Sequence, residues 1–398
     1  MANISCDRAA RELLGYCLRG EPWPRSLLLG LTEDDCSRDL LRVVAEGLAD
    51  RFEPALCDTY AALFSEALAA VEPELDAQAL LARYRRIRVG QAVSPAFRTR
   101  NVFVLSRVTL GADVAITSII LNAAKQRFPD ARIFLVGSRK SWELFEGDPR
   151  IEHLPVGYPR GGSLRERLDG WRDLRRALSQ PESITIDPDS RLTQLGLTPV
   201  CRDEDYYFFE SRSYGGDGDD SLGTLTTRWV AETFGVEGSR AYIAPKQSTA
   251  GQPEITVSLG VGENPAKRIG DPFEAELLAA LALRGATVLI DKGAGGEEAE
   301  RVERAIPRSE HVHCWEGSFA GFASAIAGSR LYIGYDSAGQ HVAAACGVPL
   351  VSIFAGFPTA RMAARWRPTG PGPIEVVRVD DPDPKQVLEM AVQAIERL

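Results

Sequence analysis

The residues best placed for chemistry lie in a turn near the C-terminal end of the chain. The run 331–335 (LYIGY) is short and β-prone, which predicts a buried parallel strand. Asp336 and Ser337 follow as good helix N-cap residues, and Gly347 is of the type found just past a helix end. We therefore expect a short helix between them and a second strand over 350–354.

This turn lies where a strand–helix unit can bind an anion. The carboxyl end of a parallel strand is the ligand-binding edge of an open α/β sheet. Backbone N–H groups at a helix start favour negative charge, above all phosphate. The alternative is an ordinary turn in which Asp336 only caps the helix. On the turn alone, both interpretations stay open.

A second turn of the same kind contains Asp113. The run 101–106 predicts a strand, residues 114–128 have apolar residues at helical spacing, and 131–137 predicts the next strand. This strand–turn–helix–strand order predicts the start of a second parallel sheet. By its position alone, Asp113 is a helix N-cap.

The composition is that of a soluble globular protein with more than one domain. The chain has 398 residues, of which 44% are hydrophobic and 25% are charged. No apolar run approaches the roughly 20 residues of a membrane helix, and the N-terminus lacks a signal-peptide core. A net charge of −9 argues against nucleic acid as a partner and allows at most peripheral membrane contact. We expect a cytoplasmic protein.

The seven cysteines are scattered along the chain without a CxxC pair. This pattern favours reduced thiols over a disulfide framework or a zinc site. The acidic stretch 215–220 (GGDGDD) lacks the ligand spacing and the distal Glu of a calcium loop. We therefore expect no metal site.

The chain divides into three predicted parts. Residues 1–95 carry apolar residues at helical spacing, with prolines between the helices. We interpret them as a helical extension packed on the domain behind it; the alternative is a module that binds an acceptor or a partner. A proline-containing linker leads to a Rossmann-like domain over 96–245, and a second one occupies 246–398.

Residues 336–341 (DSAGQH), followed by AAACGVPLVSIFAG, resemble the donor-site signature of a known enzyme family. It is the ADP-heptose:lipopolysaccharide heptosyltransferase family, glycosyltransferase family 9. That signature has Asp, then Ser or Thr, then Gly, with a His five positions after the Asp. Asp336 and His341 keep this spacing. The order Ala338-Gly339 departs from it, because the family usually has its Gly directly after the Ser or Thr.

The stretch 110–137 (LGADVAITSIILNAAKQRFPDARIFLVG) is similar to the opening strand–helix–strand unit of the same family. Asp113 and Thr117 hold the family spacing, with Ala112 as one extra residue between the Gly and the Asp. In the family the corresponding Asp is the proposed general base that deprotonates the acceptor hydroxyl. That role needs a carboxylate within hydrogen-bond reach of the hydroxyl. The resemblance thus implies that Asp113 is the catalytic base, which is compatible with helix capping.

The second Rossmann-like domain resembles the donor domain of the family. A strand over 254–260 is followed by a loop carrying Lys267 and Arg268, a helix, another strand and a glycine turn. In the family a Lys of this loop neutralises the diphosphate, and a fixed cation lowers the barrier for a departing diphosphate. Either Lys267 or Arg268 matches that residue; the alternative is a surface Lys-Arg pair.

The resemblance assigns the remaining site residues by position. Asp336 would contact the donor sugar or the ribose, and Glu316 and Ser318 would face the ribose or the base. The residues implied for the donor diphosphate are Lys267, Arg268, Ser337, Ala338, Gly339 and His341. Further candidates, at strand ends on the acceptor side, are Thr117, Asp187, Asp189 and Arg191.

Together these features predict the GT-B fold: α/β, two Rossmann-like domains facing a cleft, with an N-terminal all-helical extension. The resemblance implies an inverting, metal-independent glycosyltransferase without a cofactor. It would move heptose or a related sugar from ADP-heptose, its co-substrate, to a hydroxyl of a glycan, lipid-linked, protein or small-molecule acceptor.

Two other functions fit the same features. One is a nucleotide-sugar 2-epimerase of the same fold, and the other is a non-catalytic protein that binds a nucleotide sugar or a partner. A dehydrogenase is disfavoured, because neither domain has a GxGxxG loop after its first strand.

Overall fold

The computed structural model describes residues 5–246, 253–262, 264–293 and 295–398. Glu263, in the loop before Lys267, and Ala294, in the glycine turn, lie outside the described residues. The chain forms two compact units, each assembled from three segments. Unit 1 comprises Met1–Val108, Ala123–Arg139 and Arg150–Ser239, and unit 2 comprises Thr109–Asn122, Lys140–Pro149 and Arg240–Leu398.

Unit 1 is built around a five-stranded parallel sheet in the order β3-β2-β1-β4-β5. The two central strands are buried almost throughout, and the strand over 101–105 has the continuous apolar run of a strand that is covered on both faces. The strands are β1 (Asn101–Leu105), β2 (Arg132–Gly137), β3 (Ile151–Pro155), β4 (Ser183–Asp187) and β5 (Tyr206–Phe208). The helices of this unit that follow them are α10 (Leu164–Leu178), η3 (Arg191–Thr193), η4 (Asp203–Asp205) and α11 (Leu222–Phe234). The short helix α9 (Arg139–Trp142) follows β2, and all but its first residue is grouped with unit 2.

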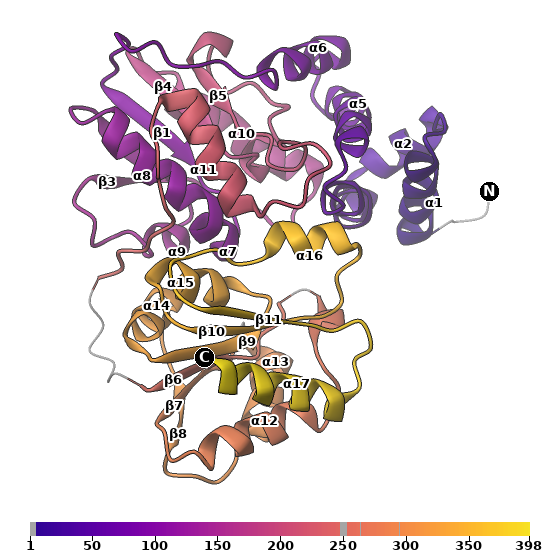
Figure 1. Cartoon of the computed structure of the whole chain (residues 1–398). Helices are drawn as coiled ribbons and strands as arrows, with labels where there is room; N and C mark the ends of the chain where they lie inside the picture. Colours follow the sequence, from indigo (N-terminus) through magenta and orange to yellow (C-terminus); the bar gives the residue numbers. More distant parts are fainter. Residues whose placement is uncertain (1–4, 247–252, 263, 294) are drawn as a thin grey trace. The chain divides into compact units, whose positions relative to one another are not determined.

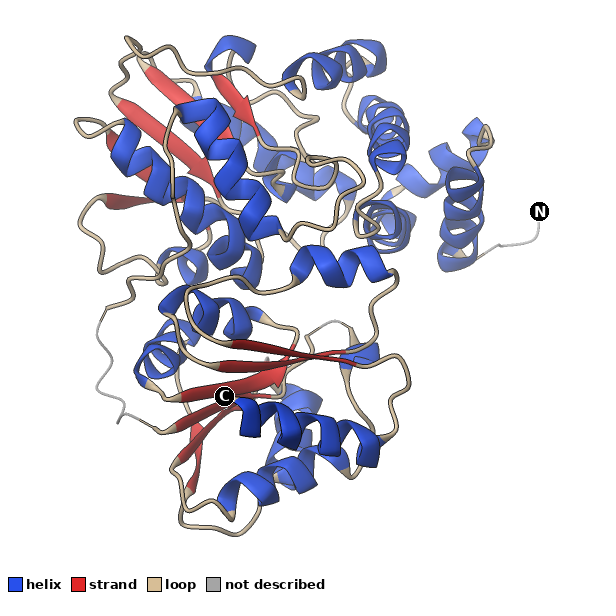
Figure 2. Ribbon diagram, in the orientation of Figure 1, coloured by secondary structure: helices blue, strands red, loops and turns tan. Residues whose placement is uncertain are grey.

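The N-terminal part of unit 1 is helical throughout, as predicted (Figure 2). The break predicted at Pro22 and Pro24 is confirmed, and Pro24 is also the N-cap of an additional helix that begins at Arg25. Phe64 and Leu68 of this part belong to the same hydrophobic core as Phe103 of the sheet, so the extension is integral to unit 1. The elements are α1 (Cys6–Arg19), α2 (Arg25–Thr32), α3 (Asp34–Asp39), η1 (Leu40–Ala45), α4 (Glu46–Ala49), α5 (Pro54–Val71) and α6 (Ala77–Ile87).

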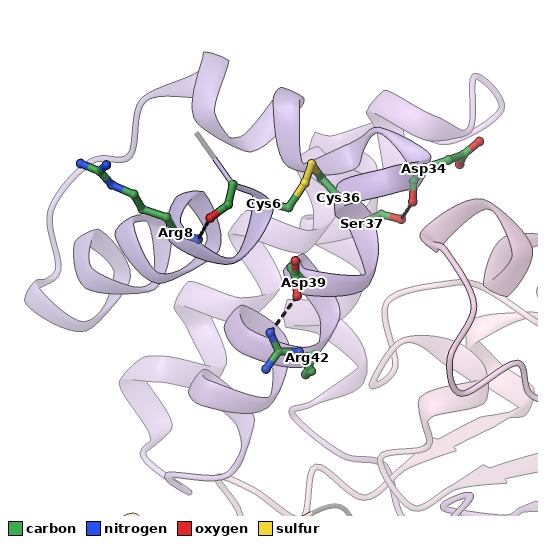
Figure 3. Close-up of a disulfide and its surroundings, with 8 residues drawn as sticks. Cys6, Arg8, Asp34, Cys36, Ser37, Asp39 and Arg42 are labelled. Atoms are coloured by element: carbon green, nitrogen blue, oxygen red, sulfur yellow. Dashed lines mark hydrogen bonds and ion pairs between the residues drawn. A yellow bond between two sulfur atoms is a disulfide. The ribbon is translucent and has the colours of Figure 1, made fainter. Parts of the chain in front are cut away.

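A disulfide joins Cys6 of α1 to Cys36 of α3, with their Cα atoms 5.1 Å apart (Figure 3). The prediction of reduced thiols is therefore wrong for these two residues. Spacing could not indicate the pair, because the packing of α1 against α3 brings together residues that are 30 positions apart. The other five cysteines are free thiols: Cys17, Cys57, Cys201, Cys314 and Cys346.

Unit 2 contains a six-stranded parallel sheet in the order β11-β10-β9-β6-β7-β8. The chain runs outward from β6 through β7 to β8, then crosses to β9 on the other side of β6. The strand order thus reverses between β6 and β9, where open α/β sheets form their ligand crevice. The strands are β6 (Ile255–Ser258), β7 (Val288–Asp291), β8 (Val312–Trp315), β9 (Leu331–Tyr335), β10 (Leu350–Phe354) and β11 (Ile374–Arg378).

Helices cover both faces of this second sheet (Figure 1). α12 packs on α13 and α17, and α14 packs on α15. The helices are η5 (Pro265–Lys267), α12 (Phe273–Ala282), α13 (Gly296–Ala305), α14 (Phe319–Gly328), α15 (Ala338–Cys346), α16 (Ala360–Trp366) and α17 (Pro384–Arg397). Both units are thus doubly wound α/β structures, as predicted. Within the residues that the structure describes, no helix is long and apolar enough to cross a membrane.

Three segments of the first predicted domain are grouped with unit 2, and the longest is Thr109–Asn122. It begins with α7 (Leu110–Ala112) and η2 (Asp113–Thr117), which continue into α8 (Ser118–Arg127). α7 and η2 pack against α15 of unit 2. The helix predicted over 114–128 is confirmed and begins earlier, at Leu110.

Candidate functional site

The reversal of strand order in unit 2 brings Lys267 and Asp336 together. Asp336 follows β9, and Lys267 ends the short helix η5 in the loop after β6. The Lys267 Nζ atom lies 2.8 Å from Asp336 Oδ2 and 2.9 Å from the Asp336 carbonyl oxygen. Both side chains are largely buried, with exposed fractions of 18% and 13%. An ammonium group has three N–H donors, so one remains for a ligand beside the start of α15.

Arg268 points away from this pair. Its guanidinium contacts Asp271 and lies 3.4 Å from the buried carboxylate of Glu274. Glu274 also accepts hydrogen bonds from Arg301 and from the Tyr335 hydroxyl, the latter at 3.0 Å. Of the two cations that matched by sequence, the structure thus places Lys267 beside Asp336, while Arg268 neutralises a buried acid.

Two residues that sequence reasoning missed complete the inner side of the site. Gln340 of α15 donates to Asp336 Oδ1 at 2.5 Å and accepts from the Ser352 hydroxyl of β10. Gln340 and Ser352 have no exposed surface. The sequence held two signals for these residues: Ser352 is a polar residue in the apolar strand 350–354, and Gln340 lies in an alanine-rich helix.

His341 is a neutral imidazole beside these groups. Burial lowers its pKa to about 4; the Lys267 charge adds to this effect, and the Asp336 carboxylate opposes it. The His341 ring lies 5.9 Å from the ring of Trp366 of α16, measured between centroids. It therefore offers one N–H donor and one lone pair at neutral pH rather than a positive charge.

Gly339 is required by what lies beneath the first turn of α15. A Cβ atom at Gly339 would lie 2.3 Å from the hydroxyl oxygen of Tyr332 in β9. One at Gly334 would lie 2.6 Å from the same oxygen. The glycine that departs from the family order thus has a packing reason in this chain. Ser337 is the N-cap residue of α15, and Ala338 is its first residue.

Glu316 and Ser318 do not lie beside the Lys267–Asp336 pair. They follow β8, the edge strand two positions from β6. Glu316 is exposed and lies 3.4 Å from Lys292, and the Ser318 hydroxyl caps α14 by accepting the Gly321 N–H at 3.2 Å. Their contact with a ribose or a base stays a prediction.

Asp113 lies within unit 2, on the segment that packs against α15. The Thr117 hydroxyl donates to Asp113 Oδ1 at 2.8 Å, and both side chains are fully buried. The segment approaches α15 closely at Gly111, where an added Cβ would lie 3.2 Å from Ala338 Cα and 3.3 Å from His341 Cδ2. The structure therefore places the start of this helix against the turn that carries His341.

The acceptor-side candidates Asp187 and Arg191 lie in unit 1 and have internal partners. Asp187 accepts from the Ser190 N–H at 2.6 Å and from the hydroxyls of Thr193 and Tyr206. Burial raises its pKa to about 6. Arg191 forms an ion pair with Glu46 of the N-terminal helices at 3.2 Å. These contacts give both residues a structural role, and their contact with an acceptor stays a prediction.

A buried ionic cluster lies at the carboxyl ends of β1, β4 and β5 in unit 1. The Arg107 guanidinium donates to the Ser211 hydroxyl at 2.5 Å, and that hydroxyl donates to Asp189 at 3.1 Å. Arg212 forms an ion pair with the same carboxylate. Sequence reasoning found only Asp189 of this cluster, because the two arginines lie in loops without a motif.

Among the residues that the structure describes, no group of three or more His, Cys, Asp or Glu side chains could hold a metal ion. Lys267 places a cationic side chain beside Asp336 at the start of α15. This arrangement suits a ligand that brings its own negative charge, such as a phosphate.

The chain has two doubly wound α/β units, and in unit 2 Lys267 lies beside the turn where the strand order reverses. This architecture is that of the GT-B class of glycosyltransferase structures. E. coli heptosyltransferase WaaC with ADP has a TM-score of 0.56 at 17% identity, over 75% of this chain and 99% of that chain. A family 9 glycosyl transferase from Veillonella parvula has 0.55 at 15%, over 77% and 98%. E. coli ADP-heptose lps heptosyltransferase II has 0.51 at 16%, over 75% and 99%. At these identities the likeness shows the fold.

A sequence-family model matches part of the C-terminal half of the chain. Residues 232–380 match the sequence model of Glycosyltransferase family 9 (heptosyltransferase). Residues 232–380 therefore form a family 9, heptosyltransferase-like glycosyltransferase domain. This agrees with the predicted resemblance and supports a glycosyltransferase enzyme. No curated protein matches the chain.

Proposed function

We propose that the chain is an inverting, metal-independent glycosyltransferase whose donor is ADP-heptose or a related ADP-sugar. WaaC has been solved with ADP and with ADP-2-deoxy-2-fluoro heptose, which supports an ADP-sugar as the donor. A hydroxyl of a glycan, a lipid-linked sugar, a protein or a small molecule supplies the acceptor oxygen. The predicted cytoplasmic location remains part of this proposal.

The observation that carries the proposal is the Lys267–Asp336 pair at the start of α15. In the reaction, the bond between the anomeric carbon and the diphosphate oxygen breaks, and negative charge grows on the departing diphosphate. The third N–H of Lys267 and the backbone N–H groups of the first turn of α15 stabilise that charge. Asp336 holds the ammonium in place and contacts the donor sugar or ribose.

Asp113 accepts the proton of the acceptor hydroxyl as the new bond to the anomeric carbon forms. The nucleophile attacks from the side opposite the diphosphate, so the configuration at this carbon inverts. Asp113 is buried, and Thr117 holds one of its carboxylate oxygens. A carboxylate oriented by such a hydrogen bond is suited to general base catalysis.

The decisive experiment compares Asp113→Asn with the wild-type enzyme in two assays. Isothermal titration without added metal measures ADP binding, and release of ADP from ADP-heptose in the presence of acceptor measures transfer. We expect Asp113→Asn to bind ADP normally and to lose about 100-fold or more of its transfer rate. Thr117→Val serves as the control: it keeps the Asp113 carboxylate but removes the hydrogen bond that orients it. Near-normal transfer by Asp113→Asn would show that the base is assigned wrongly.

A further inference from the structure

Gln340 occupies a position between the two polar residues of the donor turn. Its side-chain nitrogen lies 2.5 Å from Asp336 Oδ1 and 3.3 Å from His341 Nε2. Its side-chain oxygen accepts the Ser352 hydroxyl. Because Gln340 and Ser352 are fully buried and His341 is 6% exposed, water does not compete for these contacts.

The partners of Gln340 determine which way its amide points. An ionised carboxylate only accepts hydrogen bonds, so the group facing Asp336 must be the NH₂ end of the amide. The carbonyl end then faces Ser352, whose hydroxyl serves as the donor. One N–H of the amide is used by Asp336, and the second is left for His341.

This orientation decides where the proton of His341 resides. A neutral imidazole carries one N–H and one lone pair, and the group hydrogen-bonded to one nitrogen fixes the tautomer. The Gln340 N–H meets His341 Nε2, so this nitrogen must present its lone pair. The burial of His341 keeps the ring neutral, with a pKa of about 4. Its single proton is therefore on Nδ1.

We propose that Gln340 is a positioning residue that fixes His341 in the Nδ1–H tautomer, so that the ring presents an N–H donor to the diphosphate of the donor. The last clause of this statement rests on the proposed function, whereas the tautomer itself does not. An N–H at Nδ1 complements a phosphate oxygen, whereas the other tautomer would present a lone pair to it. Gln340 acts without touching the ligand itself.

The test is a nitrogen-15 spectrum of the full-length protein with labelled histidine. The chain has only four histidines, so the spectrum is simple, and His341→Gln assigns the signals of His341. We expect a protonated, pyrrole-type Nδ1 and an unprotonated, pyridine-type Nε2 at pH 7.5. A protonated Nε2 in the wild-type protein would overturn the proposal.

Two variants separate positioning from general packing. Gln340→Met keeps the length of the side chain but removes both N–H donors, so we expect His341 to lose its single tautomer. Ser352→Ala also alters the buried network but keeps both donors of Gln340, so the wild-type tautomer should remain. A Gln340→Met spectrum like that of the wild type would contradict the proposal. If this variant does not fold, the wild-type and Ser352→Ala spectra still decide the tautomer.

Titration with ADP then tests separately whether His341 donates a hydrogen bond to the diphosphate. We expect ADP to shift the Nδ1 proton of His341 and to bind Gln340→Met about 5- to 10-fold more weakly, the value of one hydrogen bond. Equal ADP affinity of the wild type and Gln340→Met would refute the hydrogen bond from His341 to the diphosphate. The assignment of the tautomer would still stand. Absence of ADP binding to the wild-type protein would instead refute the proposed donor.

Discussion

Lys267→Met is the substitution that tests the donor side of the site most directly. It removes the ammonium group while keeping a side chain of similar length. In the proposed complex, the N–H that Asp336 leaves unused donates to a phosphate oxygen. A hydrogen bond between charged groups contributes about 1.5–3 kcal/mol. Since 1.4 kcal/mol is a tenfold change, the Kd for ADP should rise about 10- to 150-fold.

The Asp336 carboxylate adds to the expected loss of affinity. It is only 13% exposed, so without Lys267 it becomes a nearly buried anion close to the diphosphate. We therefore expect values toward the upper end of this range. The double variant Lys267→Met/Asp336→Asn removes the uncompensated charge and should recover part of the lost ADP affinity.

The chain offers a matched control in the neighbouring residue. Arg268→Met removes the same charge from the same loop, but Arg268 faces Asp271 and the buried Glu274. We expect the Kd for ADP to change less than about twofold, because this guanidinium is not directed at the donor turn. The melting temperature of Arg268→Met should fall instead, since Glu274 then loses one of the two cationic partners that it has among the described residues and keeps Arg301.

Isothermal titration with ADP and thermal unfolding, both without added metal, distinguish these outcomes. Wild-type affinity in Lys267→Met would refute the assignment of the diphosphate cation. An equal loss of affinity in Lys267→Met and Arg268→Met would show that only the net charge of the loop matters, and that the geometric argument is wrong.

Three further predictions concern packing, protonation and covalent structure. Gly111→Ala places a methyl group 3.2 Å from Ala338 Cα, so calorimetry should show about 1–3 kcal/mol lower stability, and transfer should fall more than ADP affinity. Burial lowers the pKa of His341 from 6.5 to about 4 on folding, so its contribution is present above pH 6.5 and is lost as the pH falls toward 4. Urea unfolding should therefore show a stability loss between pH 7.5 and 5 that is smaller in His341→Gln by up to about 2 kcal/mol. Reducing Cys6–Cys36, which closes a loop of 30 residues, should cost about 3–4 kcal/mol in urea unfolding, with no further effect of reductant on Cys6→Ser/Cys36→Ser.

The sequence alone determined the two parallel sheets and the turn that carries the donor-site residues. Strands such as 331–335 are short apolar runs, and Gly347 ends the following helix by adopting a left-handed conformation with φ of 72°. These are local properties of neighbouring residues, so they can be read without knowledge of the fold. The match of residues 232–380 to family 9 agrees with that analysis.

The tertiary structure alone decided which side chains meet. Lys267 and Arg268 are adjacent in sequence, yet only Lys267 faces Asp336, because the backbone at the end of η5 directs the two side chains to different partners. Gln340 and Ser352 meet only because α15 packs against β10.

The same holds for contacts made by the N-terminal helices. Cys6 finds Cys36 because α1 packs against α3, and Arg191 finds Glu46 because the extension shares its core with the sheet of unit 1. The spacing of apolar residues along a segment indicates which backbone conformation that segment prefers. Contacts between distant residues depend on the direction in which packed helices and strands point their side chains, and only the folded chain sets that direction.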